Sequence, residues 1–125
     1  MALERMNPPE LFTPTGYHHV VKDGDTVYVA GQVGIDKDRN MGEDAASQIE
    51  QTFKNLKACL EAAGSDLHHL KKLTIYLAHR EDAPTYREIR SRYVPNELTG
   101  TGTIVIAGLA DPKVRIEIDA IAAVA

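Results

Sequence analysis

The chain has 125 residues and a mass of 13.7 kDa, enough for one domain with a single core. Its net charge of −4 argues against a nucleic-acid partner, because contacts to phosphates need a basic surface. No apolar run approaches the roughly 20 residues of a membrane span, and no secretory leader opens the chain. With one cysteine, Cys59, no internal disulfide is possible, so we expect a cytoplasmic protein without membrane contact.

The first third of the chain predicts an arm followed by a hairpin. Residues 1–14 contain three prolines and little periodicity, which predicts an irregular arm. Residues 17–21 and 26–29 read as two short strands, joined by an Asp-Gly turn that favours a tight hairpin. The second strand is expected to continue to residue 35 past a kink at Gly31.

The middle of the chain predicts two helices around a third strand. Residues 44–63 form a long helix that Gly64 ends, and residues 73–78 form the strand. Pro84 suits the first turn of the second helix, and Pro95 limits its far end. The stripes of the two helices consist of Ile49, Phe53, Leu56 and Leu60, and of Tyr86, Ile89 and Tyr93.

Two alternating segments, residues 101–109 and 115–122, close the chain as strands. The resulting order is β-β-α-β-α-β-β in one domain over residues 1–125. This order predicts an α+β fold, with a mixed sheet and both helices packed on one face. The other face would leave Val, Ile and Ala in contact with water, so we expect it to be covered in a symmetric oligomer.

Glu117 is the first candidate functional residue. It lies in the middle of the last strand, between two isoleucines, and its face of the strand also carries Asp119. One interpretation is an ordinary solvated or ion-paired carboxylate on a half-buried strand. The other is a general base held on the sheet near a row of threonines.

The histidines and the cysteine favour no metal site. His18 and His19 are neighbours in a predicted strand and point to opposite faces, so they cannot bind one ion together without distortion. A second pair, His68-His69, has no Cys or His partner at a fixed spacing. Cys59 is expected to be a packing residue. We therefore predict no metal site.

Several segments together resemble the RidA/YjgF family, also called endoribonuclease L-PSP. The resemblance runs from about Pro14 to Ala122, and the segments occur in the family order. They are Tyr17 after a Pro-x-Gly turn, Val27-Tyr-Val-Ala-Gly-Gln32, Gln48 and Asn55, Ala62-Ala-Gly64, and Ile116-Glu-Ile-Asp-Ala-Ile-Ala122.

The resemblance implies a chorismate-mutase-like fold and a homotrimer with three clefts between subunits. It also implies hydrolysis of enamines or imines, such as 2-aminoacrylate, to a keto acid and ammonia, without a metal or an organic cofactor. In the family a strand glutamate positions or activates the water, and here that residue is Glu117. Tyr17 matches the family tyrosine, and Ala30-Gly31-Gln32 matches its Ser-Gly-Gln turn, so Tyr17, Gly31 and Gln32 are expected to bind substrate.

One family residue has no counterpart. An arginine that binds the substrate carboxylate belongs at the start of the penultimate strand, where this chain has Thr101. Thr101 and Thr103 can offer hydrogen bonds to a ligand, and Arg90 of the second helix is a candidate for the lost charge. The chain thus resembles a branch without the arginine. Each of these residues also has an alternative interpretation without a function. Arg90 would then be an ordinary surface charge, the threonines would reflect strand propensity, and Tyr17 would be an amphipathic interface residue.

Three functions follow from these residues. The first is a hydrolase or deaminase that acts on an enamine, an imine or a related small amine-bearing metabolite at clefts between subunits. The second is a trimer that binds or senses a small molecule, including carboxylates, and has lost the chemistry. The third, a ribonuclease, follows only from the family label, and the acidic charge argues against it.

Overall fold

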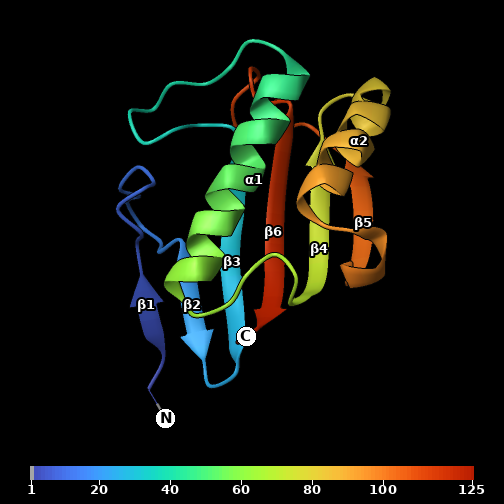
Figure 1. The fold of residues 1–125 in the computed structure, drawn as a ribbon. Helices are drawn as coiled ribbons and strands as arrows, with labels where there is room; N and C mark the ends of the chain where they lie inside the picture. The colour runs from blue at the N-terminus through green and yellow to red at the C-terminus, as the bar shows by residue number, and fades with distance from the viewer. Residues whose placement is uncertain (1) are drawn as a thin grey trace.

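The structure is a computed structural model that describes residues 2–125. One six-stranded sheet, with the strand order β1-β2-β3-β6-β4-β5, has both helices on the same face (Figure 1). The strands are β1 (Glu4–Met6), β2 (Val20–Asp23), β3 (Thr26–Val33), β4 (Leu70–Leu77), β5 (Thr101–Ile106) and β6 (Ile116–Ala123). The helices are α1 (Ala45–Ala62) and α2 (Ala83–Tyr93), with short 3-10 turns at Arg80–Asp82 and Asn96–Leu98. The α+β fold predicted from the sequence is confirmed.

The N-terminal arm differs from the prediction. Residues 1–14 were expected to be irregular, but Glu4–Met6 forms β1 and pairs antiparallel with β2. This adds one strand to the predicted order. The predicted strand at residues 17–21 begins only at Val20, because the turn around Gly16, which has a φ of 89°, carries the chain away from the sheet.

The two helices begin and end where local chemistry places them. The side chain of Asp44 caps α1 by accepting a hydrogen bond of 2.8 Å from the Ser47 amide. Gly64, with a φ of 78°, follows the end of that helix. Pro84 lies in the first turn of α2, where its missing N–H costs nothing.

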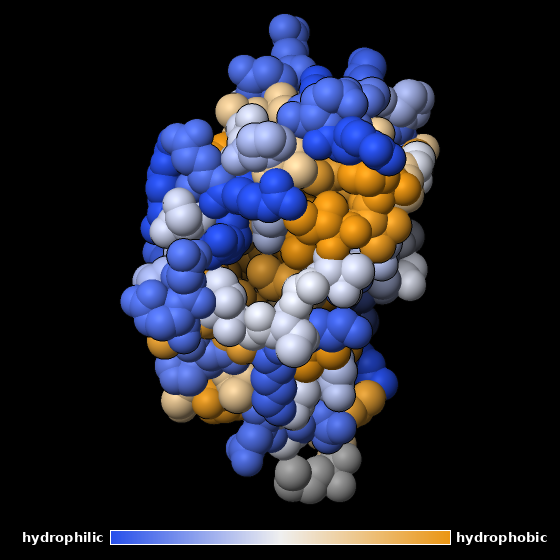
Figure 2. Space-filling model, turned by 90° about the vertical axis from the view of Figure 1, so that its right-hand side faces the viewer, coloured by the Kyte–Doolittle hydropathy of each residue, from blue (hydrophilic) through white to orange (hydrophobic). Residues whose placement is uncertain are grey.

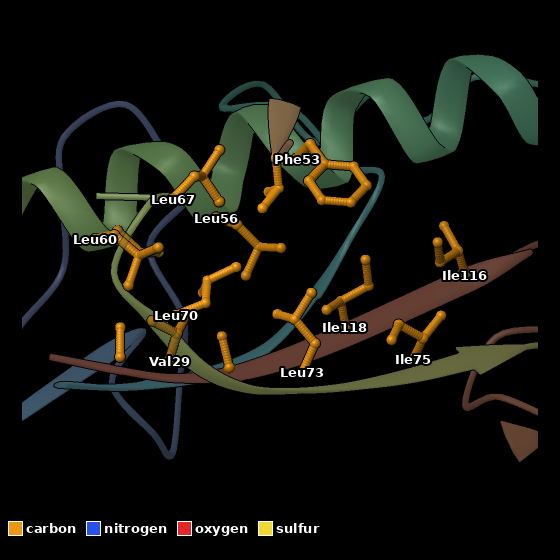
Figure 3. Packing of buried hydrophobic residues seen from close by; sticks show 14 of the residues in the cluster. Val29, Phe53, Leu56, Leu60, Leu67, Leu70, Leu73, Ile75, Ile116 and Ile118 are labelled. Carbon is orange, nitrogen blue, oxygen red and sulfur yellow. The ribbon is translucent and has the colours of Figure 1, made fainter. Parts of the chain in front are cut away.

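The core lies between the helices and the sheet (Figure 3). Phe53, Leu56 and Leu60 of α1 are fully buried against the sheet, and Phe53 also stacks on Tyr93 of α2 with ring centroids 5.1 Å apart. Each such side chain contributes about 1.5–3 kcal/mol on burial. The sheet supplies Val29, Leu73, Ile75, Ile116 and Ile118.

The opposite face of the sheet carries the other half of the alternation. Glu117, Asp119 and Ile121 of β6 are partly exposed there, between the buried positions. Tyr28 of β3, the register partner of Ile121, is 44% exposed. In residues 2–125 of one chain no helix covers this face (Figure 1), as the sequence predicted.

A bulge in β3 bends the sheet beside Glu117. Val29 pairs with Ala120 and Gln32 pairs with Ile118, so two residues, Ala30 and Gly31, lie opposite one residue of β6. The extra residue reverses the alternation beyond it. The kink predicted at Gly31 is this bulge.

Candidate functional site

Glu117 lies in a hollow of about 410 Å³ at one end of the sheet. Segments distant in sequence form it: the N-terminal arm, the end of β3 with the loop that follows, the β5–β6 loop, and the start of β6. We call it the Glu117 hollow. Its lining residues are Phe12, Pro14, Thr15, Tyr17, Val33, Ile35, Arg39, Ala110, Asp111, Val114 and Glu117.

The Glu117 side chain lies directly over Gly31. A methyl group added at Gly31 would meet Oε2 of Glu117 and come within 2.8 Å of its Cδ. Glycine is therefore required here so that the carboxylate can lie against the backbone of the bulge. Burial, and to a smaller extent the Asp119 carboxylate, raises the pKa of Glu117 above its ordinary value. A half-buried carboxylate with a raised pKa is a stronger base than an exposed one, as a water-activating group requires.

Tyr17 forms one wall of the hollow and is 45% exposed. Burial raises the pKa of Tyr17, the charge of Arg39 lowers it, and the charge of Glu117 raises it. The two charged groups thus act on the same phenol. The structure brings Tyr17 and Glu117 to one site, as predicted.

Arg39 lines this hollow although the sequence did not suggest it as a site residue. It lies in the turn between β3 and α1 and has a φ of 66°, which makes it the one non-glycine residue with a positive φ in residues 2–125. That conformation costs a side-chain-bearing residue about 1–2 kcal/mol. Its guanidinium stacks over Phe12, with Cζ 4.6 Å from the ring centroid.

A buried histidine holds the arm that carries Phe12 and Tyr17. Nε2 of His19 is 2.8 Å from the Phe12 carbonyl oxygen, and the His19 amide donates to Oδ1 of Asn7 at 2.9 Å. The ring also meets Phe12 and Tyr17 edge to face, at centroid distances of 5.0 and 5.8 Å. His19 is thus a structural residue that fixes the wall of the hollow.

Gln32 lies behind the hollow and is 2% exposed. Its amide donates to Nδ1 of His19 and to the Ala30 carbonyl oxygen, both at 3.1 Å. The bulge turns this side chain to the helix side, where it fastens β3 to the arm. Gly31 contributes space and Gln32 contributes support, while Glu117 and Tyr17 face the hollow itself.

Two other predicted binding residues, Arg90 and Thr101, line a second hollow on the β5 side of the molecule. This hollow, which we call the β5 groove, has a volume of about 260 Å³. Figure 2 shows that side, with a recess next to a patch of apolar residues. The groove is lined by Leu73, Ile75, Tyr86, Arg87, Arg90, Thr99, Gly100, Thr101, Gly102 and Ile104.

The side chains of Arg90 and Thr101 both donate hydrogen bonds to acceptors of their own chain. Nη1 of Arg90 donates to the Val94 carbonyl oxygen at 3.1 Å and to Oδ1 of Asn96 at 2.8 Å, which fastens the end of α2 to the following turn. Oγ1 of Thr101 donates to the Lys71 carbonyl oxygen at 3.1 Å. Thr103 is exposed and lies on the helix-free face of the sheet, two residues along β5.

Within one chain the two hollows are separate. On β4, Lys72 is the register partner of Thr101, and Tyr76 is the register partner of Glu117. Four residues along a strand and two strand spacings put these backbones about 13 Å apart along the sheet and about 10 Å apart across it. A single chain therefore does not bring Thr101 or Arg90 to Glu117.

The remaining histidines and the cysteine of the described residues form no metal site. Within residues 2–125 no three His, Cys, Asp or Glu side chains are grouped so as to hold a metal ion. Nδ1 of His69 is 2.7 Å from Oδ1 of Asp66, an exposed local pair. Cys59 is fully buried, and burial raises the pKa of its thiol to about 12, so it packs as a neutral side chain. Likewise, none of the helices in residues 2–125 has the length and apolarity needed to cross a membrane.

Comparison with known proteins gives the family. Residues 10–124 match the endoribonuclease L-PSP family. This chain belongs to that family. A RutC family protein of Pyrococcus horikoshii is 35% identical over 121 residues, which cover 93% of this chain and 91% of the relative. A 2-iminobutanoate/2-iminopropanoate deaminase of Rattus norvegicus is 37% identical over 108 residues, covering 85% and 78%.

Solved structures of the family share the fold. The crystal structure of RidA from an Antarctic Psychrobacter species superposes with a TM-score of 0.86 at 27% identity and covers 95% of this chain and 97% of that one. A yeast protein superposes with a TM-score of 0.91 at 25% identity and covers 98% of both chains. The membership inferred from the closing strand and the Val27–Gln32 segment is confirmed.

Proposed function

We propose that the protein hydrolyses a small enamine or imine to a carbonyl compound and ammonia at the Glu117 hollow. The observation that carries the proposal is the half-buried Glu117 carboxylate, which lies on Gly31 beside Tyr17 in a hollow large enough for a small metabolite. The names of the rat and human relatives, both 2-iminobutanoate/2-iminopropanoate deaminases, support this reaction class.

The chemistry requires one group that both takes and returns a proton. Water adds to the carbon of the protonated imine while the Glu117 carboxylate takes one proton of the water, which gives a neutral carbinolamine. Glu117 then returns that proton to the amine nitrogen and the C–N bond breaks. The hydroxyl becomes a carbonyl as its own proton passes through Glu117 to the departing ammonia, which leaves as ammonium. An enamine first becomes the protonated imine by protonation at carbon. The raised pKa of Glu117 favours its role as the proton carrier near neutral pH.

The proposal includes a cleft between subunits of a homotrimer. A monomer would leave two surfaces exposed to water. They are the helix-free face of the sheet, with exposed Tyr28, and the apolar patch beside the β5 groove (Figure 2). Association would cover them, and a neighbour would bring Arg90 and Thr101 of its β5 groove, together with Thr103 of β5, to Glu117. The threonine hydroxyls would then offer hydrogen bonds to the ligand.

The decisive experiment is a coupled assay with enzymatically generated 2-iminobutanoate or 2-aminoacrylate. We expect ammonia release well above the uncatalysed rate at micromolar protein. If folded protein with the mass of a trimer released ammonia only at the uncatalysed rate, this activity would be ruled out. A thermal-shift screen of small carboxylates would then show whether the alternative, a trimer that only binds such ligands, holds.

The assembly has its own test. Tyr28→Asp places a charge on the helix-free face, so we expect a shift from trimer to monomer in sedimentation velocity, with loss of ammonia release. Lys54→Asp, on the exposed side of α1, is the control and should leave the trimer intact. A Tyr28→Asp protein that stays trimeric and active would mean that subunits do not meet through this face.

A further inference from the structure

A carboxylate can enter the Glu117 hollow only if something offsets the acidic groups there. Glu117 and Asp111 both line it, and their charges repel an anion. Arg39 is the only basic side chain among the lining residues that the structure describes. Its position therefore determines whether the hollow accepts an anionic ligand.

The turn that carries Arg39 is tightly organised. The Asp36 carboxylate accepts hydrogen bonds of 2.9 Å from the amides of Asp38 and Asn40. The Arg39 amide donates to the Asp36 carbonyl oxygen at 3.0 Å, and the Asp36 amide donates to the Asn40 carbonyl oxygen at 2.9 Å. These bonds hold the backbone of Arg39 in its positive-φ conformation. An exposed residue is thereby fixed in direction.

The guanidinium is anchored to the arm and keeps donors free. It stacks on Phe12, and Nη2 donates to the Thr13 carbonyl oxygen at 3.0 Å. Within residues 2–125 Arg39 makes no ion pair, and this is its one side-chain hydrogen bond. A guanidinium has five N–H donors, and two parallel ones suit a carboxylate. Arg90, in contrast, already donates to two acceptors of its own chain.

We propose that Arg39 binds the carboxylate of the ligand in the Glu117 hollow, and that the ligand is a small 2-imino or 2-amino acid whose nitrogen-bearing carbon lies beside Glu117. The part that concerns the reacting carbon rests on the proposed function. Arg39 supplies, from the loop after β3 of the same chain, the positive charge that Thr101 does not. The hollow is then a two-ended site, with a cation for the carboxylate and a base for the water.

The experiment compares one acid with its uncharged analogue. 2-Oxobutanoate and 2-oxobutanamide are titrated by calorimetry into the intact protein, into Arg39→Gln and into Lys37→Gln, which removes a positive charge from the same turn. Wild-type protein should bind the acid more tightly than the amide by at least about tenfold, the value of a charge-assisted hydrogen bond. Arg39→Gln should lose that preference and Lys37→Gln should keep it. In turnover, Arg39→Gln should raise KM by a similar factor and change kcat less.

A second variant separates binding from the structure of the turn. Glycine adopts positive φ without strain, so Arg39→Gly should fold with an unchanged or higher Tm. It should nevertheless lose the preference for the acid. Arg39→Lys keeps the charge without the planar fork and should restore only part of the preference.

The outcomes separate this inference from the proposed function. Arg39 variants that bind the acid as wild type does, or a wild type without any preference for the acid, would overturn the role of Arg39. Loss of acid binding in Arg39→Gln and Arg39→Gly would support it, even if wild-type protein releases no ammonia, in which case only the hydrolase function fails.

Discussion

The two hollows of this chain differ in what their side chains are free to do. The Glu117 hollow combines a carboxylate of raised pKa, a tyrosine and a guanidinium with open donors. The β5 groove has an apolar floor, and its Arg90 and Thr101 bond to their own chain. The Glu117 hollow therefore has groups suited to transferring a proton and binding a charged ligand. The β5 groove instead has an apolar surface and polar side chains that are already hydrogen-bonded.

This difference assigns distinct roles to two sets of residues that the sequence had placed in one site. The groups that we propose to act on a substrate lie at one end of the sheet of one chain. The groups of the β5 groove can contribute to that site only from another chain, because the sheet separates them within a subunit. Variants of the two regions should consequently differ in kind as well as in size.

The largest effect is expected from Glu117→Gln, which removes the proton carrier. Ammonia release should fall by about 10²–10⁴, the usual contribution of a general base. Binding of 2-oxobutanoate should persist, and Tm at pH 7 should not fall, because the folded state no longer buries a charge. The raised pKa of Glu117 in the folded state gives the same direction. As the pH rises above the ordinary pKa of a carboxyl group, the unfolded state loses its proton more readily, so the free energy of unfolding of the wild type falls. Equal loss of binding and turnover would argue against the base role.

Two glycine substitutions test whether the Glu117 hollow depends on the bulge. In Gly31→Ala the new methyl group meets the mobile end of the Glu117 side chain, so the carboxylate moves and activity should fall more than about tenfold with little change in Tm. In Gly34→Ala the methyl group would lie 2.6 Å from the backbone of Gln48, so Tm itself should fall. Gly31→Ala with wild-type activity would mean that the carboxylate does not work from its position over the bulge.

A smaller effect is expected when a cation is added to the β5 groove. Thr101→Arg should raise kcat/KM by about two- to fivefold, the effect of one exposed charge contact, if the groove faces a neighbour's Glu117. Ala62→Arg, at the exposed end of α1 and outside both hollows, is the control for added charge. A trimer in which Thr101→Arg gains no more than Ala62→Arg would place the groove away from the chemistry.

The smallest change is expected from Asp119→Asn. The Asp119 charge raises the pKa of Glu117, so its removal should lower that pKa. The acidic limb of the kcat/KM profile, where activity falls as Glu117 takes up a proton, should then move to lower pH. The activity at the optimum should change little. An unmoved limb would assign that titration to a group other than Glu117.

Most of the fold could be predicted because long periodic segments carry their own signal. The stripe of Ile49, Phe53 and Leu60 predicted α1 within a residue at each end, and the alternation around Glu117 predicted β6. β1 could not be predicted, since Glu4–Met6 is too short to show alternation and is stabilised only by pairing with β2. Tyr17 was predicted to begin a strand but lies in a turn. The sequence could not show this, because contacts with residues distant in the chain set the position of this segment.

The sequence predicted only part of the candidate site. Glu117 and Tyr17 share a hollow as expected, but Gln32 faces inward because the bulge reverses the alternation. Arg39 carries no pattern at all: it is a turn residue whose side chain reaches an acceptor 26 positions away, at Thr13. Contacts of that range follow from the folded arm and leave no periodic trace in the sequence.

The attachment of the arm affects how this protein can diversify. The part of the chain between β1 and β2, residues 7–19, is joined to the sheet through a strand at each end, and His19 holds it at the Phe12 carbonyl oxygen. Side chains between Phe12 and Tyr17 can therefore change while the strands that carry Glu117 stay in place. On the proposed function, substitutions at residues 13–16 would change the ligand preference, which makes this segment the target for directed evolution of the substrate range.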